Sequence, residues 1–412
     1  MAQNRSEHDR GPAAPDLDAP IRVSGHTGGF VVRDFFTRNE IPFSYTPSEG
    51  PVEVRTSGGA HLVTPTLREL AAAAGCHMTV TNTSYDLVVV GAGPAGLAAA
   101  VYGAAEGLRV LVIEAFATGG QAGTTSLIEN YPGFTEGISG SDLAERTRLQ
   151  AERLGAEIVL ANSVVDGGTR DDGSRTVILD DGTQITAGAV VCSTGVEWRR
   201  LELPGLDELE ACGVFYGAAT SEAPGVRDRD IVVIGGGNSA GQAALFFARV
   251  ARSVTIAVRG EALSSTLSRY LLERIEKTQN IEVLTRTQVT AVTGDNWLRT
   301  ATLSHADGSD EEREVHALFV CIGGVPQTQW AAEHGVAVDA AGYLLTGADL
   351  RGEVAHAWPL ERPPDALETS LPRMYATGDV RHGSTKRIAT AMGEGALVVK
   401  TAHDRLTQEG LV

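Results

Sequence analysis

Paired cysteines are missing from this sequence. Its four cysteines, Cys76, Cys192, Cys212 and Cys321, are widely spaced, and no two of them form a Cys-x-x-Cys or a zinc-ligand spacing. We therefore expect four reduced thiols in a reducing compartment, without a disulfide framework and without a metal site.

Positive charge and long apolar runs are also scarce. The chain has 34 Lys and Arg against 52 Asp and Glu, a net charge of −18, which disfavours nucleic acid because phosphates would be repelled. No apolar run approaches the roughly 18–20 residues of a membrane span, and the charged N-terminus lacks the apolar segment of a signal peptide. We expect a cytoplasmic protein with neither nucleic acid nor membrane as a partner.

Aromatic residues are few and glycines are many, which favours an α/β protein with tight strand-to-helix turns. Residues 1–28 are polar and rich in Pro, Asp and Arg, and we expect them to form a disordered tail. Residues 29–83 predict a small α/β appendage followed by a linker. The pattern predicts a helix near 30–36, strands at 41–45 and 61–63, and a helix over 65–74 that begins near Thr64 or Thr66. Such a small unit buries little core alone, so it should pack on the main body.

A strand–turn–helix–strand pattern occurs twice, over 86–114 and 230–259. In the first copy, Gly91 permits a tight turn, Gly93 lets a pyrophosphate approach the backbone, and Gly96 lets helix and strand pack closely. Glu114, at the end of the second strand, would accept hydrogen bonds from ribose hydroxyls. The first copy therefore predicts a dinucleotide site with the pyrophosphate at a helix N-terminus.

The second copy repeats this geometry with Gly235, Gly237 and Ala240. Arg259 stands where the first copy has its acidic residue, and an arginine there would pair with a 2′-phosphate, which favours NADPH over NADH. Arg269 offers a second cation nearby. The alternatives are that both arginines are solvated surface residues, or that the fold persists without binding nicotinamide.

With both motifs placed, residues 85–406 resemble the low-molecular-weight thioredoxin reductase family of flavoproteins. The segments that carry the resemblance are Gly119-Gly120-Gln121, Glu129-Asn130-Tyr131-Pro132-Gly133-Phe134, Ser193-Thr194-Gly195, Ala376-Thr377-Gly378-Asp379 and Lys386-Arg387-Ile388-Ala389. The resemblance implies that FAD is held by the first glycine motif together with Gly120, Gln121, Asn130, Gly378, Asp379, Arg387, Ile388 and Ala389.

The resemblance also implies the architecture. It predicts two Rossmann-like domains, each a three-layer ββα unit, in addition to the α/β N-terminal appendage. The FAD domain would comprise 85–204 and 325–406, with an NAD(P)H domain, 205–324, inserted between them. A homodimer is implied as well.

One departure from the family concerns its chemistry. Where these reductases carry Cys-Ala-Thr-Cys after a tyrosine, this chain reads Tyr216-Gly217-Ala218-Ala219-Thr220-Ser221-Glu222. Disulfide exchange needs an attacking thiolate and a resolving thiol, so a dithiol relay is not expected. Thr220, Ser221 and Glu222 become the candidate catalytic polar groups beside the flavin; the alternative is an ordinary loop and helix start. In this replacement the chain resembles a subgroup of thioredoxin reductase-like proteins that carry a degenerate thioredoxin- or glutaredoxin-like N-terminal segment.

These features predict an FAD-dependent oxidoreductase without a dithiol site. The first hypothesis is flavin reduction by NAD(P)H, with electrons passed to an acceptor other than thioredoxin. The second is a flavoprotein oxidase or dehydrogenase that acts on a thiol or amine intermediate in a biosynthetic pathway. The substrate would be a small molecule or a carrier-bound group. The third hypothesis is a flavin-binding regulatory protein without turnover.

Overall fold

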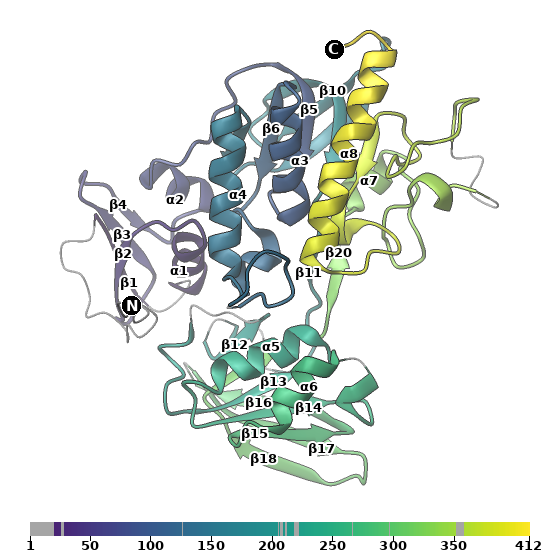
Figure 1. Cartoon of the computed structure of the whole chain (residues 1–412). Helices are drawn as coiled ribbons and strands as arrows, with labels where there is room; N and C mark the ends of the chain where they lie inside the picture. The colour runs from purple at the N-terminus through teal and green to yellow at the C-terminus, as the bar shows by residue number, and fades with distance from the viewer. Residues whose placement is uncertain are drawn as a thin grey trace, which may run out of the picture.

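The computed structural model describes residues 20–25, 29–125, 127–204, 206, 209–210, 212–217, 222–265, 267–295, 297–351 and 358–412. Figure 1 shows three units: a small N-terminal unit, a large unit with the long C-terminal helix, and a third unit below them. None of the described helices combines the length and the apolar character that a membrane span requires.

The N-terminal unit is a four-stranded sheet covered by two helices. Its strands β1 (Ile21–Ser24), β2 (Phe43–Thr46), β3 (Glu53–Thr56) and β4 (His61–Val63) lie in the order β2-β1-β3-β4. Helix α1 (Gly29–Arg38) connects the parallel pair β1 and β2, and α2 (Leu67–Ala73) follows β4. Thr66 caps α2 through a capping box with Glu69, which selects it over Thr64 as the start of the helix.

We predicted a disordered tail over 1–28, and this is wrong for residues 20–25. Residues 1–19 and 26–28 lie outside the described residues. Residues 21–24 form β1, the strand that joins β2 to β3. Ile21 and Val23 alternate with Arg22 and Ser24, and the two apolar side chains are buried in the core of this unit. A run of only four residues beside a Pro- and Asp-rich segment gives a weak pattern, and the same shortness hid β3.

The large unit is built on a sheet of parallel strands that lie in the order β7-β6-β5-β10-β21. These strands are β5 (Ser84–Val90), β6 (Val110–Glu114), β7 (Glu157–Leu160), β10 (Gln184–Cys192) and β21 (Met374–Ala376). Strands β8 (Val164–Thr169) and β9 (Arg175–Leu179) extend the sheet in antiparallel fashion from the first half of β10. Because β21 pairs with β10, chain segments on both sides of the third unit share one sheet.

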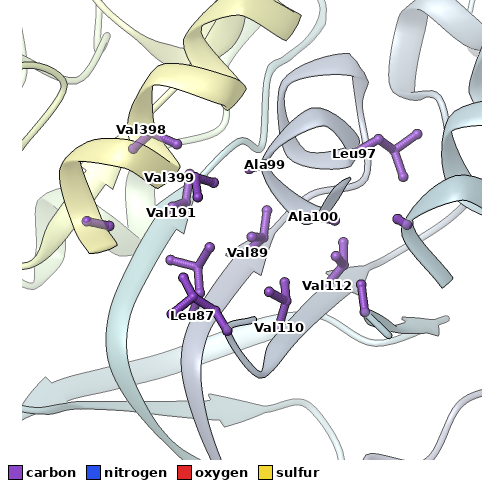
Figure 2. Close-up of a cluster of buried hydrophobic side chains, with 14 of the residues drawn as sticks. Leu87, Val89, Leu97, Ala99, Ala100, Val110, Val112, Val191, Val398 and Val399 are labelled. Atoms are coloured by element: carbon purple, nitrogen blue, oxygen red, sulfur yellow. The ribbon is translucent and has the colours of Figure 1, made fainter. Parts of the chain in front are cut away.

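Three helices cover one face of this sheet: α3 (Pro94–Ala105), α4 (Gly140–Leu154) and α8 (Ile388–Gln408). Figure 2 shows the resulting core, in which Val89 and Val112 of the strands face Leu97 of α3 and Val398 of α8. Continuous apolar strands of this kind suit a sheet that is buried on both faces.

The third unit repeats the plan. Its parallel strands lie in the order β12-β19-β13-β14-β15, and their bounds are β12 (Val214–Tyr216), β13 (Asp230–Ile234), β14 (Ser253–Val258), β15 (Ile281–Thr285) and β19 (Ala317–Val320). Helices α5 (Asn238–Phe247) and α6 (Arg269–Glu276) pack on one face. The antiparallel strands β16 (Thr287–Gly294), β17 (Leu298–His305) and β18 (Asp310–Glu314) form the other layer. The predicted fold class, two ββα dinucleotide-binding units with an α/β appendage, is confirmed.

A two-stranded ribbon joins the two larger units. It pairs β11 (Val196–Trp198) with β20 (Gly324–Pro326) in antiparallel fashion. Helix α7 (Gln329–Glu333) follows as the chain returns to the large unit. The ribbon lies between the two units in Figure 1.

Candidate cofactor site

The turn between β5 and α3 has the shape of an anion cradle. Gly91 has a φ of +102°, and a Cβ there would lie 2.5 Å from the Ser193 carbonyl oxygen. A Cβ at Gly96 would lie 1.9 Å from the carbonyl oxygen of Gly91, so only glycine lets the helix come this close. Gly93 is the N-cap of α3, and a Cβ there would meet nothing within 4 Å. The backbone at Gly93 is therefore open to a phosphate group, which the free N–H groups of the helix start favour.

Glu114 ties this turn to the segment that follows β6. Its Oε2 accepts a hydrogen bond from Ala92 N at 2.7 Å, and its Oε1 accepts from Phe116 N and Ala117 N at 2.9 and 3.2 Å. Glu114 also lines the cavity described next. This position allows the expected contact with a ribose, which stays a prediction.

One cavity of about 770 Å³ joins most of the predicted flavin residues. Its lining includes Gly93 and Glu114, Gly120 and Asn130, and Asp379 with the start of α8. Its size lies within the range of cofactor sites. Its lining combines apolar side chains with many polar and charged ones. Gln121 also lines it and donates a hydrogen bond from Nε2 to the Val196 carbonyl oxygen, at the ribbon between the units.

A carboxyl group and a helix start also belong to the lining of the cavity. Asp379 accepts a hydrogen bond from Ser384 Oγ at 3.3 Å, and burial raises the pKa of its carboxyl group. The N–H of Gly378 donates to Glu394 Oε2 at 2.8 Å, which fixes this turn against α8. Arg387, the N-cap of α8, and Ile388 line the cavity, whereas the exposed Ala389 is not among the described lining residues. A helix N-terminus here suits a negatively charged ring edge.

The second motif has the same local shape. Gly235 has a φ of +138°, and a Cβ there would lie 2.2 Å from the Cys321 carbonyl oxygen. Gly237 is the N-cap of α5, and Ala240 is fully buried beneath the turn. Arg259 follows β14 and is exposed, and its pairing with a 2′-phosphate stays a prediction. Arg269 is also exposed and pairs with Glu273 at 2.9 Å.

The first turns of α5 line the same cavity as the flavin motifs. Asn238, Ser239 and Gln242 belong to the lining, although Gly235, Gly237, Ala240 and Arg259 are not among the described lining residues. The start of α5 therefore lies at the cavity that the predicted flavin residues line. No sequence pattern predicts this arrangement, because it depends on how the two units are oriented.

Of the three predicted catalytic residues, the structure describes only Glu222. Thr220 and Ser221 lie outside the described residues. Glu222 is only 3% exposed, and its Oε1 lies 3.3 Å from a guanidinium nitrogen of Arg33 on α1. It is not among the described lining residues, so its catalytic role gains no support from this position.

Several residues that line the cavity were not predicted from the sequence. They are Arg38, Phe116, Trp198, Tyr270, Gln327 and Trp330. Ser239 could have been found by aligning the two copies of the glycine motif, because it is the second residue of the helix that starts within the second copy. No motif points to Arg38, which comes from the N-terminal unit. Among the described residues, no group of His, Cys, Asp and Glu side chains is placed to hold a metal ion.

Comparison with known proteins places the chain. Residues 85–395 match the pyridine nucleotide-disulphide oxidoreductase family. A thioredoxin reductase of Mycolicibacterium smegmatis is 34% identical over 333 residues, which is 81% of this chain and 100% of that protein. A thioredoxin reductase of Treponema pallidum is 35% identical over 78% of this chain and 97% of its own length.

Two crystal structures show the same architecture. Thioredoxin reductase of Lactococcus lactis, in its FR conformation, superposes with a TM-score of 0.70 at 30% identity, over 79% of this chain and 99% of that one. Thioredoxin reductase of T. acidophilum also gives 0.70, at 28% identity, over 79% of this chain and 100% of its own. The cofactors of this family, FAD and NADPH, fit the open backbone at Gly93, the cavity and the second motif. The chain belongs to the pyridine nucleotide-disulphide oxidoreductase family and is a thioredoxin reductase-like, FAD-dependent oxidoreductase.

Proposed function

We propose that NADPH reduces the FAD of this enzyme and that the electrons leave for an acceptor other than thioredoxin, without a protein dithiol. The shared cavity is the observation that supports this most, because Asn238, Ser239 and Gln242 of α5 line it together with the FAD motifs. Dinucleotides bind at the N-terminus of such a helix, so the nicotinamide would enter beside the flavin site. Bound FAD supplies two-electron redox chemistry, and the chain positions the two dinucleotides.

The cysteines support the absence of a thiol relay. All four are free, and none is among the described residues that line the cavity. Cys192 and Cys321 are buried, and burial raises the pKa of the Cys321 thiol to about 12. A thiol of this kind holds almost no thiolate at neutral pH, and the thiolate is the reactive form.

Anaerobic titration of the flavin absorbance with NADPH and with NADH tests the proposal. We expect NADPH to bleach the flavin at lower concentration than NADH. R259A should raise the NADPH concentration that is needed and leave NADH unchanged, because Arg259 is proposed to pair with the 2′-phosphate. R249A is the matched control: Arg249 is exposed and lies just beyond the C-terminal end of α5. If neither nucleotide bleaches the flavin, the proposed function is wrong.

The acceptor is tested in the same cuvette. Oxygen is admitted to the reduced enzyme, and small-molecule or carrier-bound acceptors are then compared with a thioredoxin disulfide. Reduction of thioredoxin that is abolished by C212S would contradict the proposal. The oxidase alternative requires that thiol or amine substrates bleach the flavin without nicotinamide and release peroxide when oxygen enters. A homodimer is part of the proposal and is tested by sedimentation.

A further inference from the structure

The N-terminal unit is docked on the segment that follows β6. Phe35 of α1 packs edge-on against Phe116, with ring centroids 5.7 Å apart. Asn39, just after α1, donates a hydrogen bond from Nδ2 to the Phe116 carbonyl oxygen at 3.2 Å. Arg38 completes this contact, because its guanidinium lies over the Phe116 ring at 5.1 Å and Nη2 donates to the Gly120 carbonyl oxygen at 2.7 Å.

This docking brings Arg38 to the phosphate end of the FAD site. A Cβ on Gly120 would lie 3.1 Å from the Cα of Gly93. Gly120, which accepts the hydrogen bond from Arg38, is therefore packed against Gly93, the open glycine that caps α3. Arg38 is itself one of the residues that line the cavity. The other two cations among the described lining residues, Lys386 and Arg387, come from the segment that starts α8.

The guanidinium keeps unused hydrogen-bonding capacity in this position. Of its five N–H donors, Nη2 serves Gly120, and Nη1 lies 3.7 Å from Asp34 one helical turn earlier. Its Nε is buried and has no hydrogen-bond partner among the described residues, so a contact with a ligand would come from the Nη atoms. Arginine presents such donors in a planar fork that matches phosphate oxygens.

We propose that Arg38 binds the pyrophosphate of FAD, so that the N-terminal unit supplies part of the cofactor site. The family match begins at residue 85, so this contact lies outside the part of the chain that the family shares. The N-terminal unit is then an element that retains the cofactor. This inference concerns binding alone and holds for any electron acceptor.

The test is the affinity of the full-length apo-protein for FAD, measured by quenching of flavin fluorescence. R38M keeps the apolar stem and removes the charge, and we expect its dissociation constant to rise about 10- to 100-fold, as for the loss of charge-assisted hydrogen bonds. R55M is the control, because Arg55 is an exposed arginine on β3 of the same unit, and we expect it to bind as the wild type does.

N39A separates direct binding from docking. Asn39 contacts Phe116 but is not among the described lining residues, so its loss should loosen the docking without removing the charge. Wild-type affinity in R38M overturns the proposal, as does a loss in N39A as large as that in R38M. If R38M fails to fold, R38K decides: a dissociation constant raised at least about threefold supports the fork-shaped contact, and wild-type affinity overturns it.

Discussion

The crossing of α3 and α8 can be tested with two glycines of one helix. Gly395 of α8 faces α3, and a Cβ there would lie 2.2 Å from the Ala95 carbonyl oxygen and 2.9 Å from the Ala98 Cβ. Gly393, two residues earlier on the same helix, is exposed, and a Cβ there would meet nothing within 4 Å. The same substitution, glycine to alanine, should therefore have opposite effects at the two positions.

The magnitudes follow from two contributions. Alanine is favoured over glycine inside a helix by about 0.5–1 kcal/mol, so G393A should raise the free energy of unfolding by that amount. G395A gains the same contribution, but the methyl group clashes with backbone of α3, and overpacking of this kind costs about 1–3 kcal/mol. We expect G395A to lower the free energy of unfolding by about 0.5–2 kcal/mol.

Urea unfolding followed by circular dichroism measures both variants, and flavin fluorescence reports release of the cofactor. Because α3 and α8 both begin at the FAD cavity, we expect G395A to release flavin at a lower urea concentration than the wild type, and G393A at a higher one. If G395A proves as stable as G393A, the close helix crossing is not the constraint that the structure indicates.

Three further results are expected. Because burial raises the pKa of Asp379, its carboxyl group favours the folded state below the unfolded pKa of about 4 and loses that contribution as the pH rises through the folded pKa. In thermal melts, D379N should therefore stabilise the apo-protein at pH 7 and not at pH 3. C212S should reduce its flavin with NADPH at the wild-type rate in stopped flow, because this half-buried thiol is not among the described residues that line the cavity, and a tenfold loss would contradict that expectation. Glu368 is fully buried and accepts two hydrogen bonds from Arg362 at 2.7 and 2.8 Å, so E368Q should lower the free energy of unfolding in urea by about 3 kcal/mol. D295N, at the exposed ion pair with Arg299, should lower it by less than about 1 kcal/mol.

Local patterns predicted most of the two large units. The strand before Gly91 and the helix after it are adjacent in sequence, so composition and spacing suffice to place the turn, and the same holds at Gly235. Strand β1 was missed for a physical reason: its place in the sheet comes from pairing with residues 43–46 and 53–56 and not from its own four residues. Short strands of this kind are specified by the sheet around them.

Contacts between units were beyond the reach of sequence patterns. Arg38 lies 82 residues from its partner Gly120, and nothing near it in sequence marks a cofactor. Glu222 was expected beside the flavin because its segment replaces a dithiol, yet it is buried against Arg33 of α1. Both outcomes depend on how the N-terminal unit packs on the other two, which is a tertiary property.

The two copies of the glycine motif show how one pattern can serve two cofactors. In the first copy the third position must be glycine, since a Cβ at Gly96 would lie 1.9 Å from the carbonyl oxygen of Gly91. In the second copy Ala240 stands at this position and is fully buried, so that turn accommodates one methyl group. The third position thus reports how closely the helix packs on its turn, while the choice of ligand depends on residues outside the motif. Glu114 and Arg259 stand at the ends of the second strands of the two copies. Their opposite charges, with that of Arg38, are what we expect to separate the electrostatic preferences of the two sites.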